Sequence, residues 1–350
     1  MKKKTKSSRA PVIAGTALIA VVLLACGLFY YLTYRRSNTV AGGAPVNIYH
    51  ATDFQGLLDS VAVSGSVKNM ATFKHVAERM HLDKNFKPGH YCLAGGLTNK
   101  QLVRVFAYGW QTPVRLIIKP HVRDLNKMSK MLGQQLEATP AEIREAMDDK
   151  EIMESHGFDK ATYLAMFLPD TYEVYWTSTP LQLLDRLWKE YEAFWNKSRT
   201  AKAQEAGLTR EEVITLASIV IEETKYEPEM PTIAGVYINR LNIGMPLQAD
   251  PTVKYAVNDP SLRRILNKHL QVNSPYNTYK NKGLPPGPMT TPTKVAIDAV
   301  LNYQHHNYIY FCAHESFNGQ HRFATNLAGH MENARRYHNA LNAQKKKAKE

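Results

Sequence analysis

Glu223 is the residue of this sequence best suited to acid–base chemistry, because it follows a run of almost wholly apolar residues that begins at Ile214. A carboxylate on an apolar surface costs folding energy unless it is paired or stays protonated. Proteins that retain such a group commonly use it as a general acid. The structural alternative is an ion pair at a frayed helix end, in which Lys225 or Arg240 supplies the cation.

A helix must position this carboxylate, and Thr209 followed by Glu212 is a capping-box pattern that starts the helix at Arg210. On a 3.6-residue period the side chains separate into two faces. The polar face holds Glu211, Thr215, Ser218 and Glu222. The apolar face holds Leu216, Ile219, Val220 and Glu223. We therefore expect Glu222 to be solvated and Glu223 to point with the apolar side chains.

Four segments in and after this helix carry a specific resemblance. They are LASIV-x-x-ET (Leu216–Thr224), INRL-x-x-GMPLQ-x-DPTV (Ile238–Val253), SPYNTY (Ser274–Tyr279) and GLPPGP (Gly283–Pro288). Together they resemble the endolytic murein transglycosylases, the MltG or YceG-like family of bacterial cell-wall enzymes. The resemblance extends from about Gly89 to about Tyr337. In this family the catalytic acid directly precedes the threonine of the first segment, and that position is Glu223 here. The chain departs from the family at Ile221, where the family often has an acidic residue.

The resemblance implies cleavage of the β-1,4 bond between N-acetylmuramic acid and N-acetylglucosamine without water. Glu223 would protonate the leaving oxygen and then accept the proton of the muramic acid 6-hydroxyl, which closes on C1 to give a 1,6-anhydro end. Because this nucleophile is intramolecular, the reaction needs no second carboxylate, and no metal or cofactor is expected. By resemblance, the partners are peptidoglycan strands and the peptidoglycan synthases; no nucleic acid is expected.

Six residues of these segments are candidates for substrate binding: Gln248, Asp250, Asn239, Tyr276, Asn277 and Tyr279. The amide of Gln248, beside a turn, suits a sugar N-acetyl group or the glycosidic oxygen. Tyrosine faces and amides suit sugar rings, although tyrosine also packs in cores, and Asn239 has the alternative role of bracing its loop. For Asp250 we favour a helix N-cap with Pro251 at the first helical position, in addition to a part in shaping the cleft.

Two other functions stay open. A hydrolytic muramidase would need a base to activate water, and Asp250 is the only motif candidate for it. A non-enzymatic scaffold that binds the cell wall would not need Glu223. A metal site at Cys312, His314 and His321 is not favoured, because these residues flank a predicted hairpin turn and no second paired ligand motif accompanies them.

Residues 10–34 contain no charged side chain, and at 1.5 Å per residue they span about 37 Å, enough to cross a bilayer with some tilt. Five Lys or Arg residues precede this stretch and two follow it, so the positive-inside rule predicts a single-pass anchor in the cytoplasmic (inner) membrane, with residues 1–9 in the cytoplasm and the body outside. The alternatives are a cleaved signal peptide and a lipoprotein signal ending at Cys26. The lipoprotein signal is not favoured, because the residues after Cys26 stay apolar where a mature lipoprotein would begin a polar tether.

The net charge of +13 suggests nucleic acid at first sight, but its distribution argues against this partner. Residues 1–36 carry +7 and the basic tail, residues 341–350, carries +3. The remaining +3 is spread over about 300 residues, so the body is nearly balanced.

The expected fold class is α+β. After a short tether of small residues, 37–45, residues 46–120 read as a small mixed domain, which by resemblance is LysM-like and implies glycan binding; a spacer is the alternative. Residues 121–340 read as a helix-rich α+β catalytic domain with two late strands.

Overall fold

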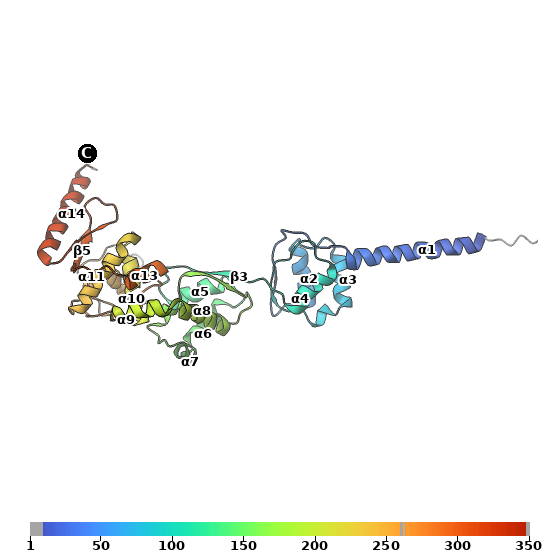
Figure 1. Cartoon of the computed structure of the whole chain (residues 1–350), viewed down its shortest axis with the longest axis horizontal. Coiled ribbons are helices and arrows are strands. Elements are labelled where there is room, and N and C mark those ends of the chain that lie inside the picture. The colour runs from blue at the N-terminus through green and yellow to red at the C-terminus, as the bar shows by residue number, and fades with distance from the viewer. Residues whose placement is uncertain (1–9, 260–261, 263, 348–350) are drawn as a thin grey trace, which may run out of the picture. The chain divides into compact units, whose positions relative to one another are not determined.

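The computed structural model describes residues 10–259, 262 and 264–347. The chain is helix-rich α+β, as expected, and it divides into two compact units (Figure 1). Unit 1 contains the described residues up to Arg115 together with Glu173–Thr177. Unit 2 contains Leu116–Tyr172 and the described residues from Ser178 onward.

Unit 1 begins with a long apolar helix, α1 (Ala10–Tyr30), which continues into a π-helical turn, η1 (Tyr31–Arg35). Residues Ile13–Arg35 form a stretch of 23 residues with a mean hydropathy of 2.3, and none of its most apolar part is buried in the protein. By length and composition this helix is able to cross a membrane.

The stretch 37–45 is not the loose tether that its small residues suggest. Asn38 and Thr39 are buried, and the backbone N–H of Asn38 donates to the Leu97 carbonyl over 2.7 Å. Thr39 Oγ1 donates to the Ala94 carbonyl over 2.7 Å. These hydrogen bonds join residues more than 50 positions apart in the sequence, and they hold this segment against the rest of unit 1.

The small mixed domain follows the order β–α–α–β, with a further helix at its end. Its elements are β1 (Val46–Ile48), α2 (Phe54–Val63), α3 (Met70–Arg79), η2 (Leu82–Lys84), β2 (Gly89–Tyr91) and α4 (Asn99–Tyr108). The strands β1 and β2 pair antiparallel, with Val46 opposite Tyr91. The two strands and three helices bury a common apolar core, in which the rings of Tyr91 and Phe106 meet edge to face at 4.9 Å.

Two strands carry the chain across the division between the units. β3 (Val114–Ile118) pairs with β4 (Asp170–Val174) in a two-stranded sheet. Between them run α5 (Leu125–Gly133), α6 (Pro140–Asp148), α7 (Lys150–Ser155) and η3 (Tyr163–Met166).

The rest of unit 2 is built around α10 (Arg210–Glu223), which begins after the predicted Thr209 capping box. The neighbouring helices are α8 (Pro180–Phe194), α9 (Lys197–Glu205), η4 (Glu227–Glu229), α11 (Met230–Asn242), α12 (Asp250–Val257) and α13 (Lys294–Leu301), with the turn η5 (His269–Gln271). Helices α9, α11, α12 and α13 and the turn η3 all contact α10. As a result every residue from Val213 to Ile221 is buried.

The prediction of a solvent-exposed polar face on α10 is therefore wrong for the two residues in its middle. Thr215 and Ser218 are buried, because the surrounding helices cover this helix on all sides. The Ser218 hydroxyl donates to the Thr215 carbonyl over 2.7 Å and accepts the N–H of Met289 over 3.2 Å. These bonds satisfy a polar group that the sequence placed in solvent.

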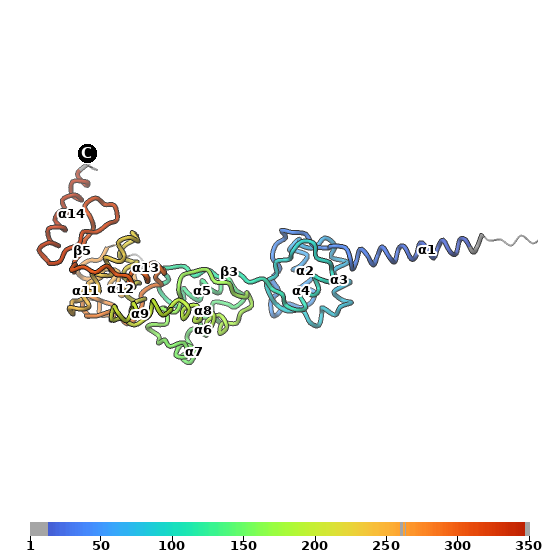
Figure 2. Tube along the Cα trace, in the orientation of Figure 1, coloured from blue at the N-terminus to red at the C-terminus, as the bar shows by residue number. Residues whose placement is uncertain are grey.

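The chain ends in a hairpin and a long helix. β5 (Tyr310–Ala313) pairs antiparallel with β6 (His321–Ala324), and α14 (Leu327–Lys347) packs against both strands. Figure 2 shows this red segment beside the yellow trace of α11, which contacts β5. The predicted hairpin with its turn between residues 315 and 320 is thus confirmed.

Candidate active site

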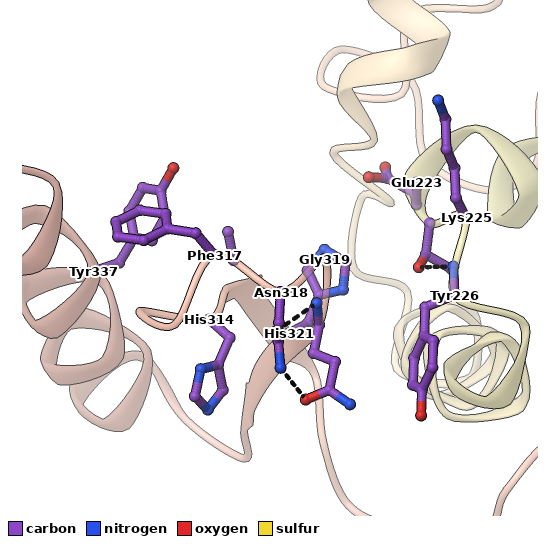
Figure 3. Close-up of a pocket in the computed structure, with 12 residues that line it drawn as sticks. Glu223, Lys225, Tyr226, His314, Phe317, Asn318, Gly319, His321 and Tyr337 are labelled. Carbon is purple, nitrogen blue, oxygen red and sulfur yellow. Dashed lines mark hydrogen bonds between the residues drawn. The ribbon is translucent and has the colours of Figure 1, made fainter. Parts of the chain in front are cut away.

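Glu223 is the last residue of α10, and Thr224 after it leaves the helical conformation. Its side chain is half-buried and borders a pocket of about 600 Å³. Figure 3 shows the carboxylate at the end of α10, facing the loop that carries Phe317 and Gly319. A buried helix thus delivers one carboxylate to the edge of an open cavity.

A tyrosine from the neighbouring helix holds this carboxylate. The hydroxyl of Tyr237, on α11, donates to Glu223 Oε1 over 2.8 Å, and Tyr237 itself is 1% exposed. Among the residues that the structure describes, Glu223 forms no ion pair, so neither Lys225 nor Arg240 plays the part of cation in a salt bridge. The carboxylate is instead oriented by a neutral donor.

The surroundings keep a proton on Glu223 at higher pH than usual. Burial raises the pKa of Glu223 to about 7; the Tyr237 hydrogen bond and the Arg240 charge oppose this rise, and the Asp250 charge adds to it. Burial, followed by the charge of Glu223, also raises the pKa of Tyr237 well above its ordinary value, so Tyr237 remains a hydroxyl donor. Near neutral pH both forms of Glu223 are populated, which lets it give a proton and take one back.

Asp250 does not cap a helix, contrary to the expectation. Helix α12 starts at Asp250 itself, Ala249 occupies the N-cap position, and no side chain caps the end. The Thr252 hydroxyl donates to the Ala249 carbonyl over 2.7 Å, a bond within the first turn. The Asp250 side chain instead accepts a hydrogen bond of 2.6 Å from the hydroxyl of Tyr279. Asp250 is exposed, and its charge acts on Glu223, but Asp250 does not line the pocket.

Arg240 fixes the loop that leads to Asp250. The residue is 6% exposed, and its guanidinium donates to the carbonyls of Ile309, over 2.7 Å, and Leu247, over 2.6 Å. Gln248 follows directly, with an exposed side chain and a φ of +48°, a left-handed conformation that costs energy in a residue other than glycine. The loop therefore holds Gln248 in a strained conformation two residues before Asp250.

The opposite wall of the pocket comes from the β5–β6 hairpin and α14. The loop contributes His314, Phe317 and Gln320, and α14 contributes Tyr337, whose ring lies 5.5 Å from that of Phe317. The hairpin is tied to η4 at His321, where Glu229 accepts two hydrogen bonds of 2.9 Å, from the backbone N–H and from Nδ1. Both side chains are largely buried, so this pair fixes one side of the pocket.

Glu222 is not solvated as expected. Its carboxylate lies 2.8 Å from His121 Nδ1 and 3.2 Å from Arg123 Nη2, and its side chain is 19% exposed. The preceding segment of unit 2 folds over this face of α10, which a helical projection cannot show. The two neighbouring glutamates nevertheless differ, because Glu222 forms ion pairs and Glu223 faces the pocket.

None of the six predicted binding residues lines this pocket, and three of them have partners within the fold. Asn277 is fully buried and donates to the carbonyls of Leu270 and Val272, which makes it a structural residue of its loop. Tyr276 is half-buried, and its ring lies 4.7 Å from that of Tyr255 rather than at the pocket. Asn239 Nδ2 donates to the carbonyls of His306 and Tyr308, over 2.7 and 2.9 Å, which supports the alternative role of bracing.

Sequence reasoning missed Tyr237 and Tyr337. Tyr237 lies in an apolar run on α11, where a tyrosine reads as core; the available signal was that a buried hydroxyl requires a partner. Tyr337 lies on a polar helix far along the chain, and no local pattern connects it to Glu223. Of the residues considered as metal ligands, His321 binds Glu229 and His314 lies 3.7 Å from Glu315.

Comparisons with known proteins identify the family of this chain. The model described as the YceG-like family matches residues 46–336. An endolytic murein transglycosylase from Bacillus subtilis is 39% identical over 130 residues, which is 37% of this chain and 35% of that protein. An endolytic murein transglycosylase from Streptococcus pneumoniae is 26% identical over 362 residues, which covers 92% of this chain and 64% of that protein. The chain thus spans less than two thirds of the length of these relatives.

A solved structure has the same fold. The crystal structure of a YceG-like protein from Listeria monocytogenes superposes with a TM-score of 0.54 at 25% sequence identity. The superposition covers 82% of this chain and 97% of that one.

Proposed function

Because the chain belongs to the YceG-like family, we propose that it is an endolytic lytic transglycosylase of peptidoglycan. Its reaction is cleavage of the β-1,4 bond between N-acetylmuramic acid and N-acetylglucosamine, which leaves a 1,6-anhydro end. The observation that carries this proposal is Glu223 at the edge of the pocket, with its pKa raised to about 7.

In the first step the protonated carboxyl of Glu223 donates its proton to the glycosidic oxygen. The C1–O bond breaks, its electron pair stays with the leaving N-acetylglucosamine oxygen, and C1 becomes oxocarbenium-like. The raised pKa supports this step, because it keeps part of Glu223 protonated at neutral pH.

In the second step the Glu223 carboxylate removes the proton of the muramic acid 6-hydroxyl, whose oxygen forms the new bond to C1. The acid regains its proton and no water is consumed. The nucleophile is already part of the substrate, so its effective concentration is high. Tyr237 supports both steps, because its hydroxyl stabilises the carboxylate form that follows the first step.

Product analysis tests the chemistry. Full-length protein in detergent is given purified peptidoglycan in ¹⁸O-labelled water, and the fragments are weighed. We expect anhydro ends without label. Glu223→Gln should lower product formation roughly 10³-fold, whereas Glu222→Gln, the matched control, should lose only its contacts with His121 and Arg123 and stay active. Unlabelled anhydro ends made at full rate by Glu223→Gln would contradict the assignment.

A hydrolytic muramidase is the second candidate, and one observation favours it. Asp250 has no capping role, is exposed, and acts electrostatically on Glu223. A carboxylate so placed is able to activate water. Label at free reducing ends would identify this reaction. A scaffold without activity would show neither product, with wild-type protein or with the variant.

The setting of the enzyme is part of the proposal. The apolar α1 supports a single-pass anchor in the cytoplasmic membrane, with the N-terminus inside and the chain that follows η1 outside. The β–α–α–β order of residues 46–91 is compatible with a LysM-like module that binds glycan. Substrate would then be newly made glycan near the membrane, cleavage would end or shorten growing strands, and peptidoglycan synthases are the proposed partners. Of the binding residues, Gln248 and Tyr279 are proposed to touch substrate, with Asp250 beside them.

A further inference from the structure

A basic pocket lies where the apolar helix ends. Its volume is about 380 Å³, and it is lined by Tyr34 and Arg35 from η1 and by Thr98, Lys100, Gln101 and Arg104 from the start of α4. Arg35, Lys100 and Arg104 are exposed, and no acidic residue lines the pocket. The first turn of α4 also places the positive end of a helix dipole here.

A second pocket, of about 260 Å³, borders the same helix end. Phe29 and Leu32 give it an apolar side, and Arg36 and Lys68 give it a cationic side. A cavity with this division matches a molecule that has a charged group joined to an apolar chain.

The cations of the two pockets have no acidic partner in the part of the chain that the structure describes. Arg35, Arg36, Lys68, Lys100 and Arg104 form no ion pair there, although Lys74, two residues after Thr72 of the second pocket, pairs with Glu78 at 3.9 Å. Five like charges gathered at one level repel one another, and an anion would relieve that repulsion.

Hydrogen bonds fix the position of these cations along the axis of the apolar helix. Asn99 Nδ2 donates to the Thr33 carbonyl over 2.9 Å, and Asn38 Nδ2 donates to Asn99 Oδ1 over 2.6 Å. Asn99 and Thr33 are buried, so α4 is joined directly to the end of η1. From Ile13 to Arg35 the helix rises about 34 Å, which places Arg35 at the headgroup level if the apolar part crosses the bilayer.

From this arrangement we propose that the two pockets bind the phosphate groups of anionic phospholipids in the outer leaflet. Arg35, Lys100 and Arg104 contact one phosphate, while Arg36 and Lys68 contact another whose acyl chain lies along Phe29 and Leu32. The proposal rests on the membrane anchoring proposed above. It is independent of Glu223 and of the reaction.

Native mass spectrometry of the delipidated full-length protein in detergent tests this site. The probes are phosphatidylglycerol, phosphatidylcholine, a polyprenyl diphosphate and inorganic phosphate. We expect wild-type protein to retain phosphatidylglycerol with at least tenfold preference over phosphatidylcholine, since Lys and Arg near the membrane surface attract lipids that carry a net negative charge. Lys100→Gln with Arg104→Gln should remove most of this preference.

The matched control is Arg79→Gln with Lys84→Gln, which makes the same charge change in the same unit. Arg79 ends α3, about 10 Å along the helix from Thr72, the last residue of α3 that lines the second pocket. This control should keep the preference. Equal retention of the two phospholipids, a preference that survives the Lys100 and Arg104 changes, or binding of only the diphosphate or inorganic phosphate would each overturn the proposal.

The same spectra separate this proposal from those on which it rests. The measured mass shows whether α1 is still present, and its loss would refute the anchor and the lipid site together. Transglycosylase activity toward soluble glycan should be unchanged in the Lys100 and Arg104 variant, so failure of the lipid site leaves the chemistry intact.

Discussion

At the scale of single residues, the site consists of two carboxylates that each accept a hydrogen bond from a tyrosine. Tyr237 donates to Glu223 and Tyr279 donates to Asp250, over 2.8 and 2.6 Å. Tyr237 favours the ionised form of Glu223, whereas the charge of Asp250 favours its protonated form. Removing either influence should move the pH dependence of activity, in opposite directions.

Tyr237→Phe removes the donor and leaves the ring. The pKa of Glu223 should rise, so the loss of activity on the alkaline side, where the acid is deprotonated, should begin at higher pH than in wild type. The rate should fall about tenfold, because a hydrogen bond to a charged group is lost. A pH–rate profile of anhydro-product formation measures both effects. An alkaline limb that moved to lower pH would contradict the role given to Tyr237.

Asp250→Asn removes a negative charge near Glu223 while nearly keeping the shape of the side chain. The pKa of Glu223 should fall, so the alkaline limb should move to lower pH and activity at neutral pH should decrease. Because Asp250 does not cap α12, the melting temperature should change little. Tyr237→Phe serves as the control with the opposite shift. If the wild-type products instead carry label from water, and Asp250→Asn makes no labelled product, Asp250 would be the base of a hydrolase.

At the scale of elements, local signals were predictable and long-range packing was not. The start of α10 followed from Thr209 and Glu212, because a capping box involves neighbours in sequence. The facing of Glu223 also followed from helical periodicity. The burial of Ser218 and the ion pairs of Glu222 did not, since they depend on segments more than 70 residues away.

Asp250 shows a further limit of local patterns. An Asp–Pro pair commonly starts a helix, and α12 does start there, but one residue earlier than a cap requires. The side chain is free to leave the helix end because Tyr279, 29 residues later, supplies a hydrogen bond of 2.6 Å. The motif thus predicted the element and missed the role of its first side chain.

One pair, Glu229 with His321, ties the hairpin that walls the pocket to η4. Glu229→Gln preserves size but places an amide against two N–H donors, so the β5–β6 hairpin should loosen. We expect faster hydrogen exchange over residues 310–324 and a higher KM with a smaller change in kcat. Glu227→Gln, two residues earlier and exposed, is the control and should show neither effect. Unchanged exchange in Glu229→Gln would show that α14 alone holds the hairpin.

At the scale of the whole molecule, the first prediction concerns how the chain is anchored in the membrane. The length and the charge-free sequence of α1 favour an uncleaved anchor. Mass spectrometry of protein extracted from membranes should find the N-terminus intact. A diacylated N-terminal Cys26 would replace the anchor by a lipoprotein linkage.

The clamp formed by Asn99, Thr33 and Asn38 has a mechanical consequence. A membrane helix tilts until its apolar length fits the local bilayer, and it stands more upright where the bilayer is thick. If α1 is the anchor proposed above, the small domain should lean with it, because Asn99 of α4 is hydrogen-bonded to the end of η1. A change in bilayer thickness would then change the tilt of this helix and, with it, the orientation of the small domain relative to the membrane.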